Sequence, residues 1–422
     1  MTTQVGYVRP ADLDLVEPAA HDVVVVGAGL TGLALALDLS LRGLRPVVLE
    51  QNPGIHVHGI ASRGIAYAKR TLEIFQRYGI AERVLERGFT WSRGRIYLGE
   101  EELYGFDLQP DRNQRWPAFV NTQQLYVEEI LVERIEELGM ADLRWSSSVA
   151  EIDPDAEGVC LQVDTPDGRY PLRANWVVAA DGARGTTRKM LGIESPVVLF
   201  EDLWCIVDVR IDREDLNERR FTLESPLVNG AAVIQHRMGE GILRTDWQTV
   251  NLPDPEAEAT PERATARLRA LLGTDDFELV ALSPWRFKVR VMDRFVHGRV
   301  VFAGDAAHEI PPFGARGGNS GIQDADNLGW KLAAVVNGTA DASLLDSYDA
   351  ERGEAARANA GFAGQSARFV SPQTDAERLF RDAVIDLARR HEWARALVNT
   401  GRLSTATTYT DSPLVIPDDA VF

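Results

Sequence analysis

The sequence has little cysteine and little positive charge. Its 422 residues contain only two cysteines, Cys160 and Cys205, which stand alone rather than in a spaced cluster. One disulfide between them is conceivable, but we expect both thiols to be reduced in a cytoplasmic protein. The 45 Lys and Arg residues face 63 Asp and Glu residues, giving a net charge of −18. This charge argues against general affinity for nucleic acid or for an anionic membrane surface.

Long apolar runs and familiar catalytic clusters are also absent. The most apolar stretch, residues 23–41, is interrupted by three glycines and Asp38, so it favours a buried strand and a helix over a membrane span. Residues 1–20 carry acidic side chains where a signal peptide would be apolar, and a loosely ordered arm is expected there. His56 and His58 have no accompanying carboxylates or thiols, so no metal site is expected. No Ser-His-Asp or Cys-His arrangement is legible.

The stretch HDVVVVGAGLTGLALALDLSLRGLRPVVLEQ, residues 21–51, predicts a strand, a tight turn, a helix and a second strand. Gly27, Gly29 and Gly32 fit G-x-G-x-x-G, in which the helix N-terminus faces a pyrophosphate. Glu50 follows Gly32 by 50 − 32 = 18 positions, where a carboxylate can accept the ribose hydroxyls of an adenosine. Dinucleotide binding is therefore predicted, although this motif alone does not separate FAD from NAD.

The remaining pattern predicts an α/β protein, α+β overall, in which one domain is interrupted by another. A helix with a break near Gly79, a hairpin over 93–108 and a helix over 123–139 precede short antiparallel strands. We predict a discontinuous Rossmann-like domain, a mainly β substrate domain, and C-terminal helices with a tail that loops over the surface. The Rossmann-like domain covers residues 21–90, 116–195 and 286–355. The substrate domain covers residues 91–115 and 196–285, and the C-terminal helices and tail cover residues 356–422.

Two further glycine turns follow predicted strands, at Asp181–Gly182 and at Gly304–Asp305. Together with GAGLTG they resemble the three fingerprints of the FAD-dependent aromatic hydroxylases, the single-component flavoprotein monooxygenases of the para-hydroxybenzoate hydroxylase type. The resemblance extends over most of the chain, from about residue 21 to about 403. LRTDWQ, residues 243–248, resembles a substrate-domain strand of the phenol, hydroxyphenylpropionate and polyketide hydroxylase branch.

The resemblance implies an enzyme that uses FAD, NADPH or NADH, and O2 to hydroxylate a phenolic or polycyclic aromatic substrate through a flavin C4a-hydroperoxide. It implies a wall of Pro311 and Pro312 beside the flavin, with Arg316 near the reaction. A helix starting near Asn319 would stabilise the reduced flavin through its N-terminus. The cofactor-binding residues implied are Gly27, Gly29, Leu30, Thr31, Gly32, Glu50, Gln51, Arg63, Gln124, Asp181, Gly182, Gly304, Asp305, Pro312, Gly314, Gly317, Gly318 and Asn319.

Substrate contacts are less distinct in the sequence. Trp204, His236, Arg244 and Trp247 are candidates on predicted strands of the inserted domain, where an ordinary strand or core role is favoured over a substrate contact. For His308, the resemblance favours a structural or flavin-side role over that of a catalytic base. The small-molecule partners expected are an aromatic compound, NAD(P)H and O2, acting on a monomer or homodimer.

Several positions depart from the family pattern. The more widespread loop reads PPFGGQGMN, whereas this sequence has PPFGARGGN, so that Ala315 replaces a glycine and Arg316 a glutamine. Arg316 could add positive charge near the flavin or near a bound anion, or it could simply face solvent. Gly185 occupies a position where the family often has serine. Relatives in this branch often continue past a segment like YTDSPL into a thioredoxin-like domain, for which this sequence leaves no room before Phe422.

Three other functions stay open at this point. A Baeyer–Villiger or oxidative-decarboxylation monooxygenase would share the fold, and a flavin-binding protein without turnover would share the motifs. A plain NAD dehydrogenase would need only the first glycine turn. A flavin halogenase is not expected, because its W-x-W-x-I-P signature is absent.

Overall fold

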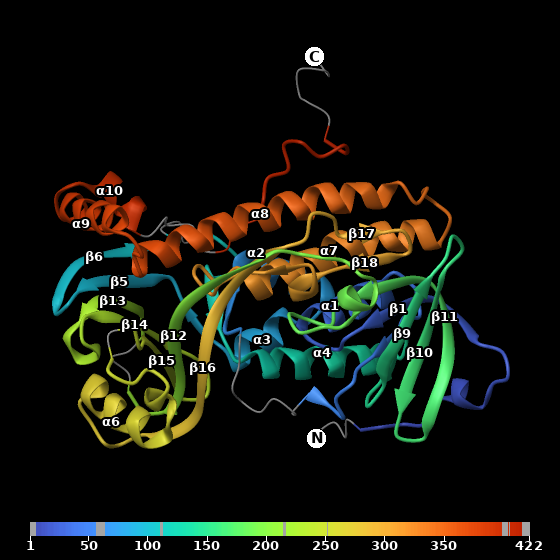
Figure 1. Ribbon diagram of the computed structural model, residues 1–422, viewed down its shortest axis with the longest axis horizontal. Helices are drawn as coiled ribbons and strands as arrows, with labels where there is room; N and C mark the ends of the chain where they lie inside the picture. Colours follow the sequence, from blue (N-terminus) through green and yellow to red (C-terminus); the bar gives the residue numbers. More distant parts are fainter. Residues whose placement is uncertain are drawn as a thin grey trace, which may run out of the picture.

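The computed structural model describes residues 6–55, 64–109, 113–213, 217–250, 252–398, 404 and 406–415. It is a mixed α/β protein with two large sheets and one small sheet among these residues, which confirms the predicted fold class. Figure 1 shows the two large sheets at opposite ends of the molecule, with a helical layer between and above them.

The first sheet is parallel at its centre. β1 pairs in parallel with β2 and with β11, as expected for strands whose valine runs are buried on both faces. A hairpin of β9 and β10 extends one side of β11. The strands are β1 Ala19–Val26, β2 Val47–Leu49, β8 Asp142–Arg144, β9 Ser148–Pro154, β10 Val159–Thr165, β11 Gly168–Ala179, β17 Val296–His297 and β18 Val300–Phe302.

Helices cover this sheet and continue into a long C-terminal layer. α1 packs against both α4 and α7, so it is buried almost all round. The predicted break at Gly79 separates α2 from α3, because Gly79 ends α2 in the left-handed conformation at φ 76°. The helices are α1 Leu30–Leu41, α2 Lys69–Tyr78, α3 Ala81–Arg87, α4 Gln124–Leu138, α5 Thr187–Met190, α6 Pro261–Leu272, α7 Gly317–Val336, α8 Leu344–Val370, α9 Asp375–Arg390 and α10 Glu392–Val398.

The second sheet is largely antiparallel and has the order β19-β16-β12-β15-β14-β13-β5-β6. Its long strands β12 and β16 run from the far end of the sheet toward the helical layer (Figure 1). Its strands are β5 Arg93–Leu98, β6 Glu101–Asp107, β12 Val197–Arg210, β13 Arg219–Ser225, β14 Ala231–Arg237, β15 Ile242–Gln248, β16 Glu278–Val291 and β19 His308–Glu309. A three-stranded sheet of β3 Ala66–Ala68, β4 Phe89–Trp91 and β7 Phe119–Asn121 lies at the junction.

The two faces of the second sheet differ. On the outer face, Trp247 and Cys205 pack with Ala264 and Leu268 of α6 in one apolar cluster. On the inner face, Trp204 belongs to a different cluster, together with residues from the 311–316 loop and from α8. Trp247 lies opposite Cys205, the neighbour of Trp204 on β12. Since neighbouring residues of a strand point to opposite faces of the sheet, Trp204 and Trp247 cannot line one pocket.

The start of the described chain is better anchored than the sequence suggests. Asp12 is buried, and its Oδ2 accepts hydrogen bonds from Arg144 and His21, so the prediction of a loosely ordered N-terminal arm is wrong for this segment. Most described residues of the tail, from 408 to 415, are exposed, and Ser412 is buried where its hydroxyl donates to Glu351 Oε1. No helix of the described residues is long and apolar enough to cross a membrane.

Candidate active site

The first glycine turn joins β1 to α1 and is closed by backbone packing. Gly27 has φ 104°, and a Cβ there would lie 2.5 Å from the Ala180 carbonyl oxygen. A Cβ on Gly32 would lie 1.9 Å from the Gly27 carbonyl oxygen. A Cβ on Gly29, in contrast, would meet nothing within 4 Å. The protein therefore leaves open space at the N-terminus of α1, where exposed backbone N–H groups suit a pyrophosphate.

Glu50 lies beside this turn, directly after β2. Its Oε2 accepts a hydrogen bond from the Ala28 backbone N–H at 2.8 Å, and its Oε1 accepts from the Asn52 N–H at 2.9 Å. The adjacent Gln51 is exposed. The carboxylate is thus fixed at the edge of the open space, in position for ribose hydroxyls.

The second glycine turn follows β11. Asp181 Oδ2 accepts a hydrogen bond from the Thr187 N–H at the start of α5, and Gly182 adopts φ 76°. A Cβ on Gly185 would lie 2.1 Å from Asp181 Cγ, so a side chain at 185 requires Asp181 to move. The departure from serine at 185 therefore matches the observed position of Asp181.

The third glycine turn follows β18 and packs on the first. A Cβ on Gly304 or on Gly321 would lie 2.5 or 2.3 Å from Thr31 Oγ1 of α1. Arg188 of α5 donates to the Ala306 carbonyl oxygen at 3.1 Å, which links the second turn to the third. Asp305 is exposed at this point. The fold thereby gathers three motifs that are far apart in the sequence.

The loop from Pro311 to Arg316 leads into α7. Pro311 is buried whereas Pro312 is exposed, and the predicted wall beside the flavin stays a prediction. Gly314 has φ 86° and Ala315 has φ 54°, which is strained for a residue with a side chain. α7 begins at Gly317, two residues before the predicted start. Its first residues are glycines, which leave their N–H groups approachable.

Arg316 does not face solvent, so that alternative is wrong. The residue is 3% exposed, and its Nη1 donates to Asn359 Oδ1 of α8 at 2.8 Å. The guanidinium also lies over the Phe362 ring, 5.0 Å from its centroid. Arg316 therefore ties the start of α7 to α8, and its catalytic role stays a prediction.

The Asn319 side chain connects the start of α7 to neighbouring segments. Its Oδ1 accepts hydrogen bonds from the Ala68 N–H and from Thr71 Oγ1, and its Nδ2 donates to the Ala66 and Ala315 carbonyl oxygens. These contacts occupy the side-chain amide and tie the start of α7 to β3, to α2 and to the preceding loop.

Gln124 is the first residue of α4, which follows β7 of the small sheet. Its Oε1 accepts from the Gly64 N–H at 3.2 Å, and its Nε2 donates to Glu128 Oε1 at 2.7 Å. Arg63, His56 and His58 lie outside the described residues.

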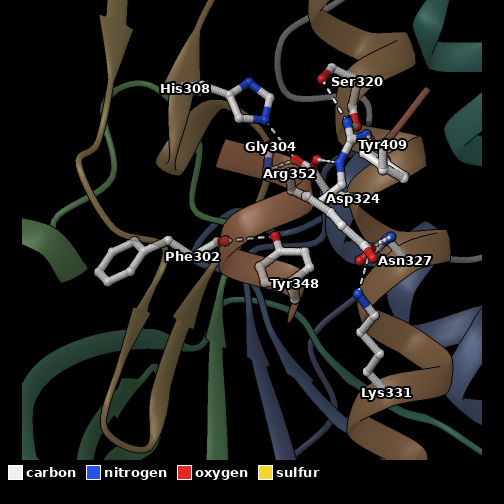
Figure 2. Close-up of polar contacts among 11 residues, drawn as sticks. Phe302, Gly304, His308, Ser320, Asp324, Asn327, Lys331, Tyr348, Arg352 and Tyr409 are labelled. Atoms are coloured by element: carbon white, nitrogen blue, oxygen red, sulfur yellow. Dashed lines mark hydrogen bonds and ion pairs between the residues drawn. The ribbon is translucent and has the colours of Figure 1, made fainter. Parts of the chain in front are cut away.

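A buried polar network, here called the Asp324 network, supports the third turn from behind (Figure 2). Asp324 Oδ2 accepts from the Gly304 N–H at 2.9 Å and lies 2.7 Å from His308 Nε2. Its Oδ1 accepts from Arg352 Nε at 2.6 Å. Burial alone would raise the pKa of Asp324, but His308 and Arg352 hold it far below its ordinary value. The network fixes the turn that carries Asp305.

The Asp324 network continues into the tail. Arg352 also donates to Tyr409 Oη, to Ser320 Oγ and to the Ser320 carbonyl oxygen. Next to it, Glu351 accepts from Lys331, Asn327 and Ser412. Sequence reasoning missed these residues, since the only signal was ionisable residues on otherwise small, apolar helix faces. His308 is fully buried and paired with Asp324, which fits the structural role that the sequence favoured over a catalytic one.

The inner face of the second sheet meets these turns at Phe313. The Phe313 ring lies 5.8 Å from that of Trp204 and 5.6 Å from that of Phe287, edge-on to both. Farther along, Arg244 makes a two-pronged ion pair with Asp208, at 2.6 and 2.8 Å. His236 lies opposite Arg244 and is buried. Trp204, His236 and Arg244 thus share this face, whereas Trp247 is on the other.

Comparison with known proteins decides the family. Residues 20–363 match the family model described as "FAD binding domain". The chain belongs to this FAD-binding family. The open space at Gly29 and the fixed Glu50 carboxylate fit FAD, which these two groups would hold at its pyrophosphate and ribose. The three fingerprints were therefore interpreted correctly, and FAD is the cofactor.

The similar proteins are named as hydroxylases or monooxygenases of phenolic compounds. The chain is 31% identical to a 3-(3-hydroxy-phenyl)propionate/3-hydroxycinnamic acid hydroxylase of Mycolicibacterium smegmatis, over 87% of this chain and 64% of the relative. It is 32% identical to a probable NADH-specific resorcinol 4-hydroxylase of Rhodococcus jostii, over 88% and 69%. A crystal structure of p-nitrophenol 4-monooxygenase from Pseudomonas putida superposes with a TM-score of 0.80 at 27% identity, over 92% of this chain and 99% of that one. The chain thus spans less than two thirds of the first relative's length.

Proposed function

We propose that this protein is an FAD-dependent monooxygenase that uses NADH or NADPH and O2 to hydroxylate a phenolic or polycyclic aromatic compound. One observation carries the proposal: Phe313, within the loop after the third turn, packs edge-on against Trp204 of the second sheet. The cofactor turns and an aromatic-lined sheet face therefore meet at one place. The relatives' names favour a monocyclic phenol as the first substrate class to examine.

FAD, when bound, supplies hydride acceptance from NAD(P)H and the activation of O2. The residues of this chain hold and shield the reactants. Trp204, Phe287 and Phe313 offer an aromatic surface on which a substrate ring can stack while water is excluded. The N-terminus of α7, free of side chains at Gly317 and Gly318, presents a positive dipole end to negative charge.

The cysteines and the net charge bear on where the protein works and what it binds. Cys160 and Cys205 are both free thiols, which supports a reducing, cytoplasmic environment. The acidic net charge supports small-molecule partners over nucleic acid or anionic membrane. A monomer or a homodimer is expected.

The test is substrate-stimulated flavin reduction followed by labelled-oxygen analysis. Purified protein carrying FAD is mixed anaerobically with NADH or NADPH, with and without phenol, resorcinol and 4-nitrophenol. We expect at least one phenol to accelerate bleaching of the flavin at least about tenfold, which corresponds to about 1.4 kcal/mol of barrier. Labelled O2 should then place one oxygen atom on the aromatic ring. No acceleration by any compound of a wider aromatic panel would contradict the proposal.

The same experiment separates the alternatives. A label found in an ester or with loss of CO2 indicates Baeyer–Villiger or decarboxylating chemistry. Ligand binding without any flavin reduction indicates a binding protein without turnover. The family assignment already argues against a plain NAD dehydrogenase, and a purified protein without flavin absorbance would reopen that possibility.

A further inference from the structure

The inner face of the second sheet carries a group of polar atoms that the described protein leaves without partners. These are Asp246 Oδ1, His236 Nδ1, Arg219 Nε and Gln123 Oε1, each shielded from solvent and without a hydrogen-bond partner among the described residues. We call Gln123, Arg219, His236 and Asp246 the open cluster. A buried polar atom without a partner costs about 1–3 kcal/mol, so four in one place call for an explanation.

Strand register brings three of the four side chains together. His236 lies opposite Arg244 on β15, and Asp246 follows two residues later on the same strand and face. Arg219 precedes Phe221 by two residues on β13, and Phe221 lies opposite Ile234, the partner of Asp246. Burial, together with the charges of Arg219 and Arg244, lowers the pKa of His236 well below its ordinary value, which is consistent with this proximity.

The fourth member comes from the FAD-binding half of the molecule. Gln123 is the residue before α4, and its Nε2 donates to Asp208 Oδ2 at 3.4 Å. Asn121 of β7 also reaches this end of the sheet, donating to the Arg237 carbonyl oxygen at 2.9 Å. The open cluster therefore lies at the border between the sheet and the cofactor half, beside Gln124.

An aromatic surface lies one step along the same face. Gln248, two residues beyond Asp246, is opposite Trp204. Two residues of a strand span about 6.8 Å, which suits one aromatic ring with its hydroxyl. A molecule lying on this face would thus have its ring against Trp204 and Phe313 and its polar end at the open cluster.

We propose that the open cluster binds the hydroxyl group of the aromatic substrate, with Asp246 Oδ1 as the proton acceptor and Arg219 as the neighbouring positive charge. The inference rests on the proposed function and adds the group that activates the ring. The O–H bond of the phenol breaks, its proton passes to Asp246, and the electron pair stays on the phenolate oxygen. Net charge is unchanged, and neutral His236 offers a second hydrogen bond.

The charges around Asp246 suit this task. Burial, opposed by Arg244 and Arg219 and reinforced by Asp208, raises the pKa of Asp246 to about 7. Arg244 is already committed to Asp208 by two hydrogen bonds. Burial lowers the pKa of Arg219 to about 10, so Arg219 remains a cation at neutral pH. Asp246 can therefore exchange a proton near neutral pH while the arginines keep their charge.

The test compares phenols with their methyl ethers on the FAD-loaded protein. Binding of phenol, anisole, 1-naphthol and 1-methoxynaphthalene is followed by the change in the flavin absorption spectrum between about pH 5.5 and 8.5. Since the ionised carboxylate accepts the hydroxyl proton, we expect phenol affinity to fall up to about tenfold per pH unit below about pH 7. The ethers should bind independently of pH.

Substitutions assign this behaviour to one residue. Asp246→Asn should remove the pH dependence and weaken phenol binding at least about tenfold with FAD content unchanged, whereas Asp246→Glu should restore the pH dependence. Asp276→Asn, at an exposed carboxylate of the same sheet domain, is the matched control and should behave as the parent protein. Equal binding of phenols and ethers by the parent protein would overturn the proposal, as would Asp246→Asn retaining the pH-dependent phenol preference.

The two proposals fail differently. If phenols stimulate flavin reduction equally in the parent protein and in Asp246→Asn, at every pH, the function stands and the role of Asp246 is wrong. If no phenol stimulates reduction in the parent protein, the proposed function itself fails.

Discussion

Two of the buried polar clusters among the described residues differ in whether each oxygen of the central carboxylate has a hydrogen-bond partner. In the Asp324 network both carboxylate oxygens of Asp324 have partners, and Arg352 binds Asp324, Ser320 and Tyr409, while His308 Nδ1 and Asn327 Oδ1 lack partners among the described residues. In the open cluster, buried atoms of Asp246, His236 and Arg219 lack partners among the described residues. The fully paired Asp324 carboxylate holds backbone in place, whereas the unpaired Asp246 Oδ1 can still accept a hydrogen bond from a ligand. The first lies behind the cofactor turns, and the second lies on the proposed substrate face.

The comparison predicts opposite outcomes for substitutions in the two clusters. The largest effect is expected from Arg352→Met, which leaves the buried Asp324 carboxylate with the His308 ring and the Gly304 N–H as its partners among the described residues. We expect the free energy of unfolding to fall by about 3–5 kcal/mol. Arg169→Met, in an exposed pair with Asp164, should change it by less than about 1 kcal/mol. Urea denaturation of all three proteins measures both values, and equal losses would remove the distinction between network and surface pair.

The glycines of the first turn repeat the contrast between filled and open space. Gly32→Ala forces a Cβ against the Gly27 carbonyl oxygen and should cost about 3 kcal/mol of stability. Gly29→Ala meets no protein atom, so the apoprotein should keep its stability while FAD affinity falls at least about tenfold. Thermal denaturation and fluorescence titration with FAD separate the two effects. Unchanged FAD affinity in Gly29→Ala would contradict the placement of the pyrophosphate.

Asp246→Asn should stabilise the protein, in contrast to substitutions in the Asp324 network. The pKa of Asp246 is about 7 in the folded state against an ordinary 3.8, so its contribution to stability is lost as pH rises between these values. The free energy of unfolding of Asp246→Asn should therefore exceed that of the parent by about 1–3 kcal/mol near pH 8, and the difference should vanish near pH 4. Denaturation at both pH values measures it. A loss of stability at high pH would mark Asp246 as a purely structural residue.

The smallest effect is expected in the loop before α7. Ala315 has φ 54°, so Ala315→Gly relieves backbone strain but adds freedom to the unfolded chain. The two terms oppose each other, and we expect a net gain below about 1 kcal/mol. Differential scanning calorimetry can resolve such a change. A clear loss would indicate that the Ala315 methyl group makes a packing contact that outweighs the strain.

The sequence predicted the parts of the site that depend on backbone. Gly27, Gly182 and Gly304 stand where positive φ is required, so their spacing alone revealed the three turns and the fold. It did not predict the Asp324 network, whose partners join α7, α8 and the tail. Arg316 illustrates the limit, because its burial against Asn359 depends on where α8 packs. The faces of Trp204 and Trp247 depend on strand register, which single candidate residues do not reveal.

The most direct test of the distinction between the two clusters is a crystal structure of the FAD-loaded protein with a phenol bound. The quantity to measure is the distance between the phenol oxygen and Asp246 Oδ1. The predicted result is a hydrogen bond of about 2.5–3.0 Å, with the ring against Trp204 and with the Asp324 network unchanged. A phenol oxygen bound elsewhere, with Asp246, His236 and Arg219 still unpartnered, would contradict it.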